Sequence, residues 1–274
     1  MSDTHPKISI ITASFNRSRT LERSILSVLN QNYPNLEYII IDGGSTDGTV
    51  DVIKRNERHL SYWVNEPDKG IADAWNKGLC KATGEIISML NSDDWYEPNV
   101  FNTVATIFNQ NPLVDIVHGN IRYWRNNKSL YIKRPYLKQG AIWKSMPYLF
   151  PSCFIKKSLY DQYGLFNTSY KITMDYELML RFFTKRKNFL YIDKTIANFE
   201  LGGLSDVKCA SGLIENKDIV ICYGYSKVKA YLNLWWFLSR RYLVRVFEKS
   251  HLGFIIDGVK KQSGQWSYEE KGGK

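Results

Sequence analysis

Short apolar segments alternate with segments of helical periodicity over the first third of the chain. The apolar runs predict four buried strands: Lys7–Thr12, Tyr38–Ile41, Ser61–Asn65 and Ile86–Leu90. Leu21, Ile25 and Val28 recur at helical spacing between the first two strands, and Gly70–Ala82 predicts a helix before the fourth. Strands that alternate with helices indicate right-handed βαβ units, in which helices cover both faces of a mostly parallel sheet. The sequence therefore predicts an α/β fold.

The alternation becomes less regular after Asp94. The pattern predicts helices over Val100–Asn109, Lys156–Tyr163 and Tyr176–Phe183, and strands over Asp115–Gly119 and Phe189–Asp193. Residues 121–150 are rich in aromatic and basic side chains and show no clear period. From about Lys217 onward the chain is expected to be mostly helical. We therefore expect a helical C-terminal appendage on the α/β unit.

Polar clusters follow three of the predicted strands, namely Thr12–Arg17, Asp42–Gly44 and Asn91–Asp94. Ligands of α/β sheets bind beyond the carboxyl ends of the strands, so these clusters indicate one binding site. Asp93 and Asp94 are adjacent carboxylates at such a strand end. They repel each other unless a cation neutralises them, and a divalent metal that holds a diphosphate would do so. The alternative is that both cap the helix that begins near Pro98.

Composition limits the classes of function. The 274 residues are 44% hydrophobic, which is typical of a folded globular protein, and the formal net charge is +10. This charge suits phosphorylated substrates or an anionic membrane surface, whereas no sequence signature of nucleic-acid binding is present. We expect no signal peptide, no membrane-spanning segment and a cytoplasmic location. The four cysteines are widely spaced and indicate neither a zinc site nor a disulfide framework.

The segment Asp42-Gly43-Gly44-Ser45 combines a carboxylate with two glycines directly after a strand. Its spacing matches neither the dinucleotide fingerprint nor a phosphate-binding P-loop. Because glycines let a ligand approach the backbone closely, we favour a role for Asp42 in holding a base or a ribose. The alternative is a tight turn with a helix cap, to which Thr46 and Asp47 contribute.

Four segments in order carry a resemblance to a known family. They are Ile-Ile-Thr-Ala-Ser-Phe-Asn-Arg from Ile10, Ile-Ile-Ile-Asp-Gly-Gly-Ser-Thr-Asp-Gly-Thr from Ile39, Glu-Pro-Asp-Lys-Gly-Ile-Ala-Asp-Ala-Trp-Asn-Lys-Gly from Glu66, and Leu-Asn-Ser-Asp-Asp-Trp from Leu90. Together they resemble a family 2 glycosyltransferase of the GT-A fold, closely over residues 7–120 and more weakly to about residue 205. The resemblance implies an inverting enzyme that uses a nucleotide-diphosphate sugar and a divalent cation, Mn²⁺ or Mg²⁺.

The resemblance also implies roles for particular residues. The residues implied to bind the nucleotide sugar are Thr12, Ala13, Ser14, Phe15, Arg17, Asp42, Gly44, Asp73, Asn91 and Ser92. Asp93 is the metal ligand that it implies first, with Asp94 beside it. The chain departs from the family at Asn91, which replaces the first acid of the Asp-x-Asp motif, and at Trp75, where many relatives have an arginine near the diphosphate. Lys69 or Lys77 would then supply that charge.

The second half of the chain is expected to provide the acceptor site and the general base. The segment Ile172–Arg181 resembles the family's catalytic segment at a helix start, which makes Asp175 the expected base. Its alternative role is that of a helix cap, and Glu177 is the second choice as base. The segment Gly202–Ser205 resembles a loop near the diphosphate, although a plain turn explains it equally well.

The segment Lys227–Lys261 is basic and rich in tryptophan and phenylalanine, which suits the headgroup region of an anionic bilayer. It would equally suit a helix pair that packs on the catalytic unit or on another subunit.

We expect a nucleotide-sugar half over 1–120, an acceptor half over 121–215 and a helical extension over 216–274. The expected activity is transfer of a hexosyl or N-acetylhexosaminyl group, from a UDP-sugar in particular, to a saccharide acceptor. That acceptor would be free or lipid-linked, in surface polysaccharide synthesis on the inner face of the membrane. The alternatives are a non-catalytic sugar-nucleotide-binding protein and a nucleotidyltransferase.

Overall fold

A computed structural model describes residues 5–202, 209–249 and 266–267, with side chains in the last helix described as far as Leu243. The strands are β1 Ile8–Ser14, β2 Leu36–Asp42, β3 Tyr62–Asn65, β4 Ile86–Asn91, β5 Trp95–Tyr96, β6 Ile116–Arg125, β7 Lys128–Lys133, β8 Phe154–Lys156, β9 Phe189–Glu200 and β10 Trp266–Ser267. The α-helices are α1 Leu21–Leu29, α2 Thr49–Asn56, α3 Ile71–Lys81, α4 Val100–Gln110, α5 Lys157–Tyr163, α6 Met174–Thr184, α8 Cys209–Cys222 and α9 Lys227–Lys249.

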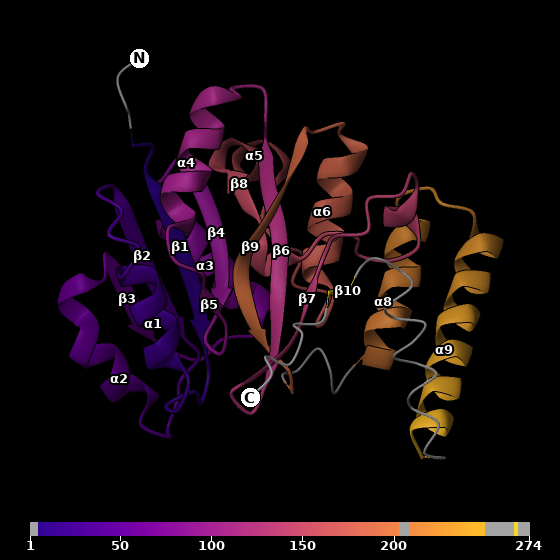
Figure 1. Cartoon of the computed structure of the whole chain (residues 1–274), viewed down its shortest axis with the longest axis horizontal. Coiled ribbons are helices and arrows are strands. Elements are labelled where there is room, and N and C mark those ends of the chain that lie inside the picture. The colour runs from indigo at the N-terminus through magenta and orange to yellow at the C-terminus, as the bar shows by residue number, and fades with distance from the viewer. Residues whose placement is uncertain (1–4, 203–208, 250–265, 268–274) are drawn as a thin grey trace, which may run out of the picture.

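The strands form one sheet with the order β10-β7-β6-β8-β4-β1-β2-β3, while β9 pairs with β6 and β5 pairs with β9. The four strands β3, β2, β1 and β4 are parallel neighbours. Beyond β4 the directions are mixed, because β8 is antiparallel to both β4 and β6 whereas β9 runs parallel to β6. The expected α/β fold with a helical C-terminal appendage is confirmed (Figure 1).

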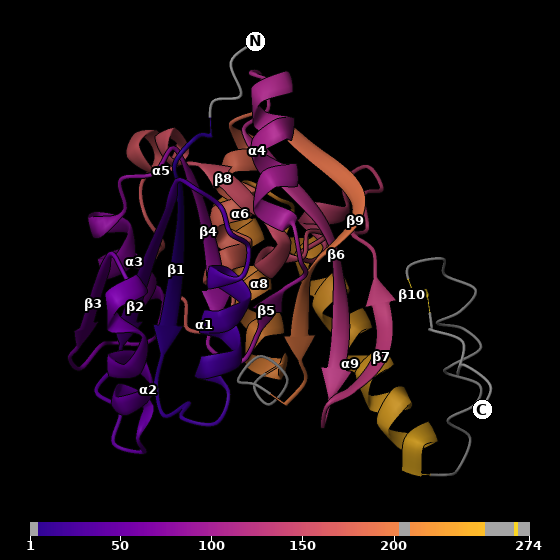
Figure 2. The ribbon, with the colours of Figure 1, turned by 60° about the vertical axis from the view of Figure 1, so that its left-hand side comes forward.

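Helices cover both faces of the sheet, as the alternation predicted. Successive residues of a strand point to opposite faces: Ile11 and Ile39 pack with α3, α5 and α6 on one face, and Ile10 and Ile40 pack with α1, α2 and α4 on the other (Figure 2). The long apolar runs of β1 and β2 are therefore explained by burial on both sides.

Two strands are longer than the sequence indicates. We expected β6 to end at Gly119 and β9 to end at Asp193, but the two strands pair in parallel from Ile116–Phe189 to Trp124–Glu200. This extension carries the end of β9 to the same edge of the sheet as the ends of β1 and β4. The strand β7, in a segment without clear period, was not predicted.

The helices α8 and α9 lie side by side at the edge of the molecule that is far from α2 (Figures 1 and 2). Ile219 and Val220 of α8 and Ala230 of α9 are buried in the larger of the two cores. The boundaries expected near residues 120 and 215 fall inside β6 and α8. Gly203–Ser205 of the expected diphosphate loop, and Lys260 and Lys261 of the basic segment, lie outside the described residues.

Candidate active site

The polar clusters at the strand ends meet at one edge of the sheet. In the pairing of β1 with β2, Ser14 lies opposite Asp42. In the pairing of β1 with β4, Ala13 lies opposite Asn91. The three carboxyl ends are therefore adjacent, which is the arrangement that the parallel sheet predicted.

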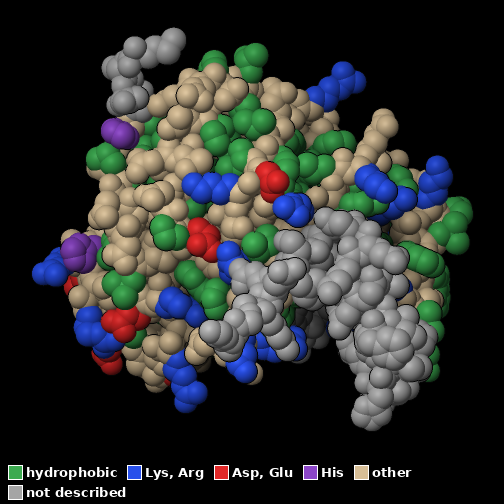
Figure 3. Space-filling view, in the orientation of Figure 1, with side chains coloured by type: hydrophobic (Ala, Val, Ile, Leu, Met, Phe, Trp, Pro, Cys, Tyr) green, Lys and Arg blue, Asp and Glu red, His purple; other side chains and the backbone are tan. Residues whose placement is uncertain are grey.

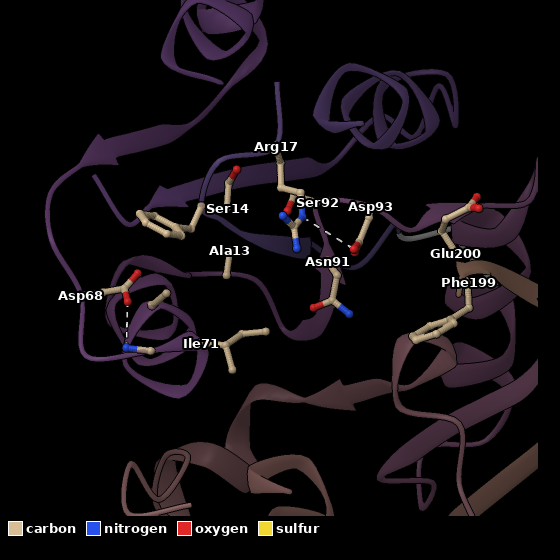
Figure 4. A pocket seen from close by; sticks show the side chains of 13 residues that line it. Ala13, Ser14, Arg17, Asp68, Ile71, Asn91, Ser92, Asp93, Phe199 and Glu200 are labelled. Carbon is tan, nitrogen blue, oxygen red and sulfur yellow. Dashed lines mark hydrogen bonds and ion pairs between the residues drawn. The ribbon is translucent and has the colours of Figure 1, made fainter. Parts of the chain in front are cut away.

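A cavity of about 340 Å³ opens at this edge. Its lining residues are Ala13, Ser14, Phe15, Arg17, Asp68, Gly70, Ile71, Ala74, Asn91, Ser92, Asp93, Phe199 and Glu200. Figure 4 shows Asp68 and Ile71 on one side of the cavity, Phe199 and Glu200 on the other, and Arg17 with Asp93 between them. Seven of the sequence-predicted residues thus converge here: Ala13, Ser14, Phe15, Arg17, Asn91, Ser92 and Asp93.

Arg17 and Asp93 form an ion pair within this cavity. Arg17 Nε lies 3.7 Å from Asp93 Oδ2, and the Asp93 side chain is 22% exposed. Burial raises the pKa of Asp93 above its ordinary value, while the positive charge of Arg17 acts in the opposite direction. The cavity therefore presents one cation and one partly buried carboxylate side by side.

Asp94 has a different environment from Asp93, and it does not line the cavity. It is fully buried, and its carboxylate accepts hydrogen bonds from Asn91 Nδ2 at 2.9 Å and from the backbone N–H of Glu200 at 3.2 Å. Burial and the nearby charge of Asp93 raise its pKa well above the ordinary range. These contacts join the end of β4 to the end of β9.

Two polar atoms at the cavity are buried without a partner. Asn91 directs its amide nitrogen to Asp94, and its Oδ1 has no hydrogen-bond partner within the described part of the chain. The hydroxyl of Ser14 likewise has none among the described residues. Unpaired buried polar atoms are unfavourable, so each of them indicates a place for a ligand atom.

The residues at this edge suit a divalent cation. Mg²⁺ and Mn²⁺ prefer oxygen ligands, and such ions commonly combine one or two carboxylates with the phosphates of a substrate. Asp93 supplies a carboxylate, Glu200 lines the same cavity, and the unpaired Oδ1 of Asn91 is a neutral oxygen. Within the described residues there is no group of three or more His, Cys, Asp or Glu side chains that would hold a metal alone. A cation here would therefore depend on oxygens of the bound substrate.

Thr12, Asp42 and Gly44 lie outside the cavity lining. Thr12 is buried one position earlier in β1, where its hydroxyl lies 3.2 Å from that of Tyr38. The carboxylate of Asp42 is fully buried and accepts hydrogen bonds from the N–H and the hydroxyl of Ser45. Gly44 has a φ of +88°, so it forms the turn that Asp42 and Ser45 close.

The positions expected around α3 also differ from the cavity lining. Asp73, in the first turn of α3, accepts at 3.1 Å from the N–H of Lys69, the residue before the N-cap Gly70. Lys77 Nζ lies 2.7 Å from Glu66 Oε1, which leaves it in a surface ion pair. Trp75 is buried, with its ring centroid 5.0 Å from that of Phe166. Neither lysine lines the cavity, where Arg17 is the basic residue that does.

Asp68, Phe199 and Glu200 are cavity residues that sequence reasoning did not select. Asp68 belongs to the third of the four family segments, and it accepts from the N–H of Gly70 at 2.8 Å. A Cβ atom on Gly43 would lie 2.4 Å from Asp68 Oδ2, so only a glycine permits this approach. Phe199 and Glu200 follow the predicted end of their strand, and no motif marked them.

Asp175 is held in the first turn of α6, and it does not line the cavity. The N-cap position is Thr173. Glu215 of α8 accepts hydrogen bonds from the N–H groups of Lys171, Ile172 and Thr173 at 2.9 to 3.0 Å. The backbone groups before α6 are thus satisfied by Glu215. Asp175 accepts from the N–H of Tyr176, and burial raises its pKa to about 6.

Glu177, the second choice as base, is engaged elsewhere. It is buried, and both of its carboxylate oxygens accept from Arg181, at 3.1 Å and 2.5 Å. Tyr223, which directly follows α8, also donates its hydroxyl to Glu177. This contact joins α6 to the end of α8.

A second, more polar cavity of about 410 Å³ adjoins the first. The two share Arg17, Asp93 and Glu200 in their linings. Gly202, which follows β9, also lines the second cavity. The Arg17–Asp93 pair therefore stands between two neighbouring spaces.

Comparison with proteins of known sequence places this fold and site in a family. The family model described as glycosyl transferase family 2 matches residues 9–170, more than half of the chain. An uncharacterized glycosyltransferase of Nostoc, alr2836, is 33% identical over 115 residues, which are 41% of this chain and 36% of the relative. A PGL/p-HBAD biosynthesis glycosyltransferase of Mycobacterium bovis is 26% identical over 211 residues, which are 73% of this chain and 80% of the relative. The match spans about a third to a half of the length of the first curated relatives, from 34% to 48%.

Solved structures support the fold at lower sequence identity. Staphylococcus aureus TarS 1–349 in complex with UDP-GlcNAc has a TM-score of 0.64 at 16% identity, over 86% of this chain and 72% of that one. The mannosyltransferase PcManGT of Pyrobaculum calidifontis, solved with GDP-Man and Mn²⁺, has a TM-score of 0.64 at 20% identity, over 84% of this chain and 70% of that one. The fold is thus the GT-A type that the four sequence segments implied, and the chain belongs to glycosyl transferase family 2.

Proposed function

We propose that this chain is an inverting glycosyltransferase that moves a sugar from a nucleotide-diphosphate donor to a hydroxyl group of a saccharide acceptor. The observation that carries the proposal is the cavity at the ends of β1 and β4. There, Arg17, Asp93 and Asn91, whose Oδ1 is buried without a partner among the described residues, line one cavity of a size typical of ligand sites. The oxygens of a diphosphate would complete the shell of a cation held at Asp93, and Asn91 Oδ1, an acceptor, would be satisfied by that cation or by a ribose hydroxyl.

The donor would lie along the strand ends. Phe15 is 57% exposed at the cavity, although it is a large apolar side chain, and it offers a ring face to a base. Asp42 is buried at the end of β2, where it accepts from Ser45. It would therefore act on the base indirectly, by fixing the turn at Ser45. The solved structures of similar fold that hold UDP-GlcNAc and GDP-Man make a nucleotide sugar the first donor class to test, and we favour a UDP-sugar.

A divalent cation, Mn²⁺ or Mg²⁺, would be held by Asp93, with Asn91 and Glu200 as the neighbouring oxygen ligands. When bound, it would neutralise the charge of the departing diphosphate. Arg17 would add a second positive charge at the same place. We assign Asp94 to positioning, because both of its carboxylate oxygens are already used by Asn91 and Glu200.

Asp175 is the proposed general base. Inversion is a single displacement: the acceptor oxygen forms a bond to C1 of the sugar, the bond from C1 to the diphosphate oxygen breaks, and the electron pair leaves with the diphosphate. One carboxylate must take the proton of the acceptor hydroxyl. Glu215 accepts from the N–H groups of Ile172 and Thr173 before α6, so these do not depend on Asp175, which accepts from the N–H of Tyr176 in the first turn. Its raised pKa also places it nearer to neutrality, where bases are effective.

The acceptor side of the proposal includes a lipid surface. The helix α9 packs on the body through Ala230 and Phe237, yet its outer side exposes apolar residues at helical spacing. They are Val228, Tyr231, Leu232, Trp235, Trp236, Tyr242 and Leu243. Figure 3 shows hydrophobic side chains at the outer edge where Figure 1 places α9. Exposed tryptophans followed about one turn later by the basic pair Arg240 and Arg241 suit an anionic headgroup region, so we propose a lipid-linked saccharide acceptor at a membrane surface. None of the described helices has the length and hydropathy that crossing a bilayer requires.

The experiment that tests this function is a screen of UDP-, GDP- and dTDP-sugars with and without Mn²⁺. We expect one donor to raise the thermal midpoint in the presence of Mn²⁺ and to be hydrolysed slowly, with release of the nucleoside diphosphate. Donor binding without any turnover, with or without saccharides, would favour the non-catalytic alternative. Release of a sugar 1-phosphate, from attack at the α-phosphate, would instead favour a nucleotidyltransferase.

A further inference from the structure

A separate cavity of about 300 Å³ lies between β6, β9 and the segment that follows β7. We call it the aromatic cavity, because six of its lining residues carry aromatic rings: His118, Tyr136, Tyr148, Phe183, Phe189 and Tyr191. Tyr148 stacks on Phe189 with ring centroids 4.6 Å apart, and His118 packs edge-on against Tyr148 at 5.0 Å. None of these residues lines the cavity at the ends of β1 and β4, which we call the donor cavity. The rings of His118, Tyr148, Phe189 and Tyr191 thus contact one another in a group that the donor site does not use.

His118 is the unusual member of this wall. It is 1% exposed, and its Nδ1 has no hydrogen-bond partner among the described residues. Burial lowers the pKa of His118 to about 4, so the ring is neutral at pH 7. A neutral imidazole retains one donor and one acceptor, and a buried unpaired nitrogen is unfavourable. A polar group of a ligand in the cavity would satisfy it.

The lining limits the chemistry of that ligand. Lys138 is the one charged residue among the described residues of this lining, so a phosphate-rich ligand would lack partners. A purely apolar lipid chain would leave His118 Nδ1 unpaired. A sugar ring has an apolar face that packs on aromatic rings and hydroxyl groups that hydrogen-bond. Gln139, exposed at the rim, adds an amide donor and acceptor.

We propose that the aromatic cavity binds a neutral sugar unit of the acceptor chain, at a distance from the reacting sugar. This inference rests on the proposed function, because it names a second contact for the same saccharide. The strand β9 links the two sites: Tyr191 lines the aromatic cavity and Glu200 lines the donor cavity. At about 3.3 Å per residue, this stretch of strand spans about 30 Å. A sugar in the aromatic cavity would thus be several units away from the reacting hydroxyl, and the site would favour long acceptors.

The test is direct titration of the full chain with neutral linear oligosaccharides of glucose, galactose, mannose and N-acetylglucosamine, two to eight units long, without donor. We expect at least one series to bind. His118→Phe keeps an aromatic ring at this position but removes the unpaired nitrogen. Tyr136→Ala removes the ring of a tyrosine that is 40% exposed. Each should weaken binding by about fivefold to tenfold. The control is Tyr242→Ala, which removes an exposed ring on α9 and should bind as the wild type does.

Titration of the same samples with the nucleotide and Mn²⁺ separates this inference from the proposed function. We expect His118→Phe and Tyr136→Ala to bind nucleotide as the wild type does. If no oligosaccharide series binds, or if both variants bind saccharide with unchanged affinity, the aromatic cavity is not a saccharide site. If His118→Phe and Tyr136→Ala weaken saccharide binding but the wild type does not bind nucleotide, the proposed donor site is wrong and the saccharide site in the aromatic cavity is supported.

Discussion

Arg23 of α1 donates from Nη2 to the backbone carbonyl oxygen of Asp93 at 3.1 Å. The same nitrogen lies 3.5 Å from Glu200 Oε2, and the guanidinium carbon lies 3.5 Å from the centroid of the Trp95 ring. Arg23 does not line the donor cavity, yet it touches both segments that bring carboxylates to it. It is therefore a positioning residue for Asp93 and Glu200.

The substitution Arg23→Lys tests this role. Lysine keeps the charge, but it has no planar group that can lie on Trp95 while donating to Asp93 and Glu200. We expect turnover to fall by up to about a hundredfold, since small displacements of a catalytic group have effects of that size. We also expect the Mn²⁺ concentration for half-maximal activity to rise. Arg55→Lys, in an exposed ion pair of α2 with Glu22, is the control and should leave both values unchanged. Wild-type metal dependence in Arg23→Lys would show that Arg23 does not position Asp93.

Asp94→Ala should act on stability, because the substitution leaves the amide of Asn91 and the N–H of Glu200 without their acceptor. Unsatisfied buried donors cost about 1–3 kcal/mol each, so we expect the free energy of unfolding to decrease by at least that amount. Denaturant titration measures it. Asp93→Ala is the matched comparison at the neighbouring position and should unfold close to the wild-type midpoint. Equal stability of the two variants would contradict the assignment of Asp94 to positioning.

The sequence predicted the first half of the fold and much of the cavity because both depend on local patterns. Buried parallel strands such as β1 and β2 appear as continuous apolar runs, and their polar ends meet by the geometry of parallel pairing. Glu200 was missed for the opposite reason. Its position depends on pairing between β6 and β9, whose residues are far apart in the sequence, and β9 has no period-2 pattern beyond Asp193. Interactions of this kind leave no local signal.

The contrast between local patterns and long-range contacts also applies to the carboxylates Asp93, Asp94 and Asp175. Their sequence neighbourhoods do not distinguish a ligand-binding role from a structural one. Adjacent acids look equivalent in a sequence, but only the structure shows that Asp94 is fully buried between Asn91 and Glu200. The N–H groups before α6 donate to Glu215, a residue of a later helix that no sequence pattern connects with Asp175. Long-range hydrogen bonds therefore decided the roles that we propose.

The raised pKa of Asp175 predicts a pH dependence. A general base acts in its ionised form, and burial holds the proton on Asp175 up to about pH 6. We expect kcat/KM to be constant above this pH and to fall about tenfold per pH unit below it. Asp175→Asn should lose about 10²- to 10⁴-fold in turnover and keep the nucleotide affinity of the wild type. Nucleotide affinity measured across the same pH range is the control. A flat profile from pH 5 to 8, or full activity in Asp175→Asn, would assign the base elsewhere.

The exposed side of α9 predicts binding to anionic vesicles. Replacing Trp235 and Trp236 by Ala removes the two largest exposed rings, and Arg240→Glu with Arg241→Glu reverses two charges. Each basic residue near an anionic surface contributes about 1 kcal/mol, so we expect the charge reversal to weaken binding at least tenfold. Sedimentation with phosphatidylserine vesicles measures it, and added salt should reduce the binding.

Leu113→Ala is the matched control for α9, since Leu113 is 81% exposed but lies on the turn between α4 and β6. It should bind anionic vesicles as the wild type does. Equal binding of the tryptophan pair variant and of Leu113→Ala would mean that α9 does not face the lipid.

The central claim is that Asp93 holds a divalent cation on the diphosphate of the donor. It is tested most directly by calorimetric titration of the wild type and of Asp93→Asn with UDP, GDP and dTDP, each with and without Mn²⁺. Asparagine keeps the size of the side chain and removes its charge, so the fold should be unchanged. We predict that Mn²⁺ strengthens binding of one nucleotide to the wild type by tenfold or more, whereas Asp93→Asn binds it equally with and without the metal. Nucleotide binding to the wild type that does not respond to Mn²⁺, or a full metal response in Asp93→Asn, would contradict the claim.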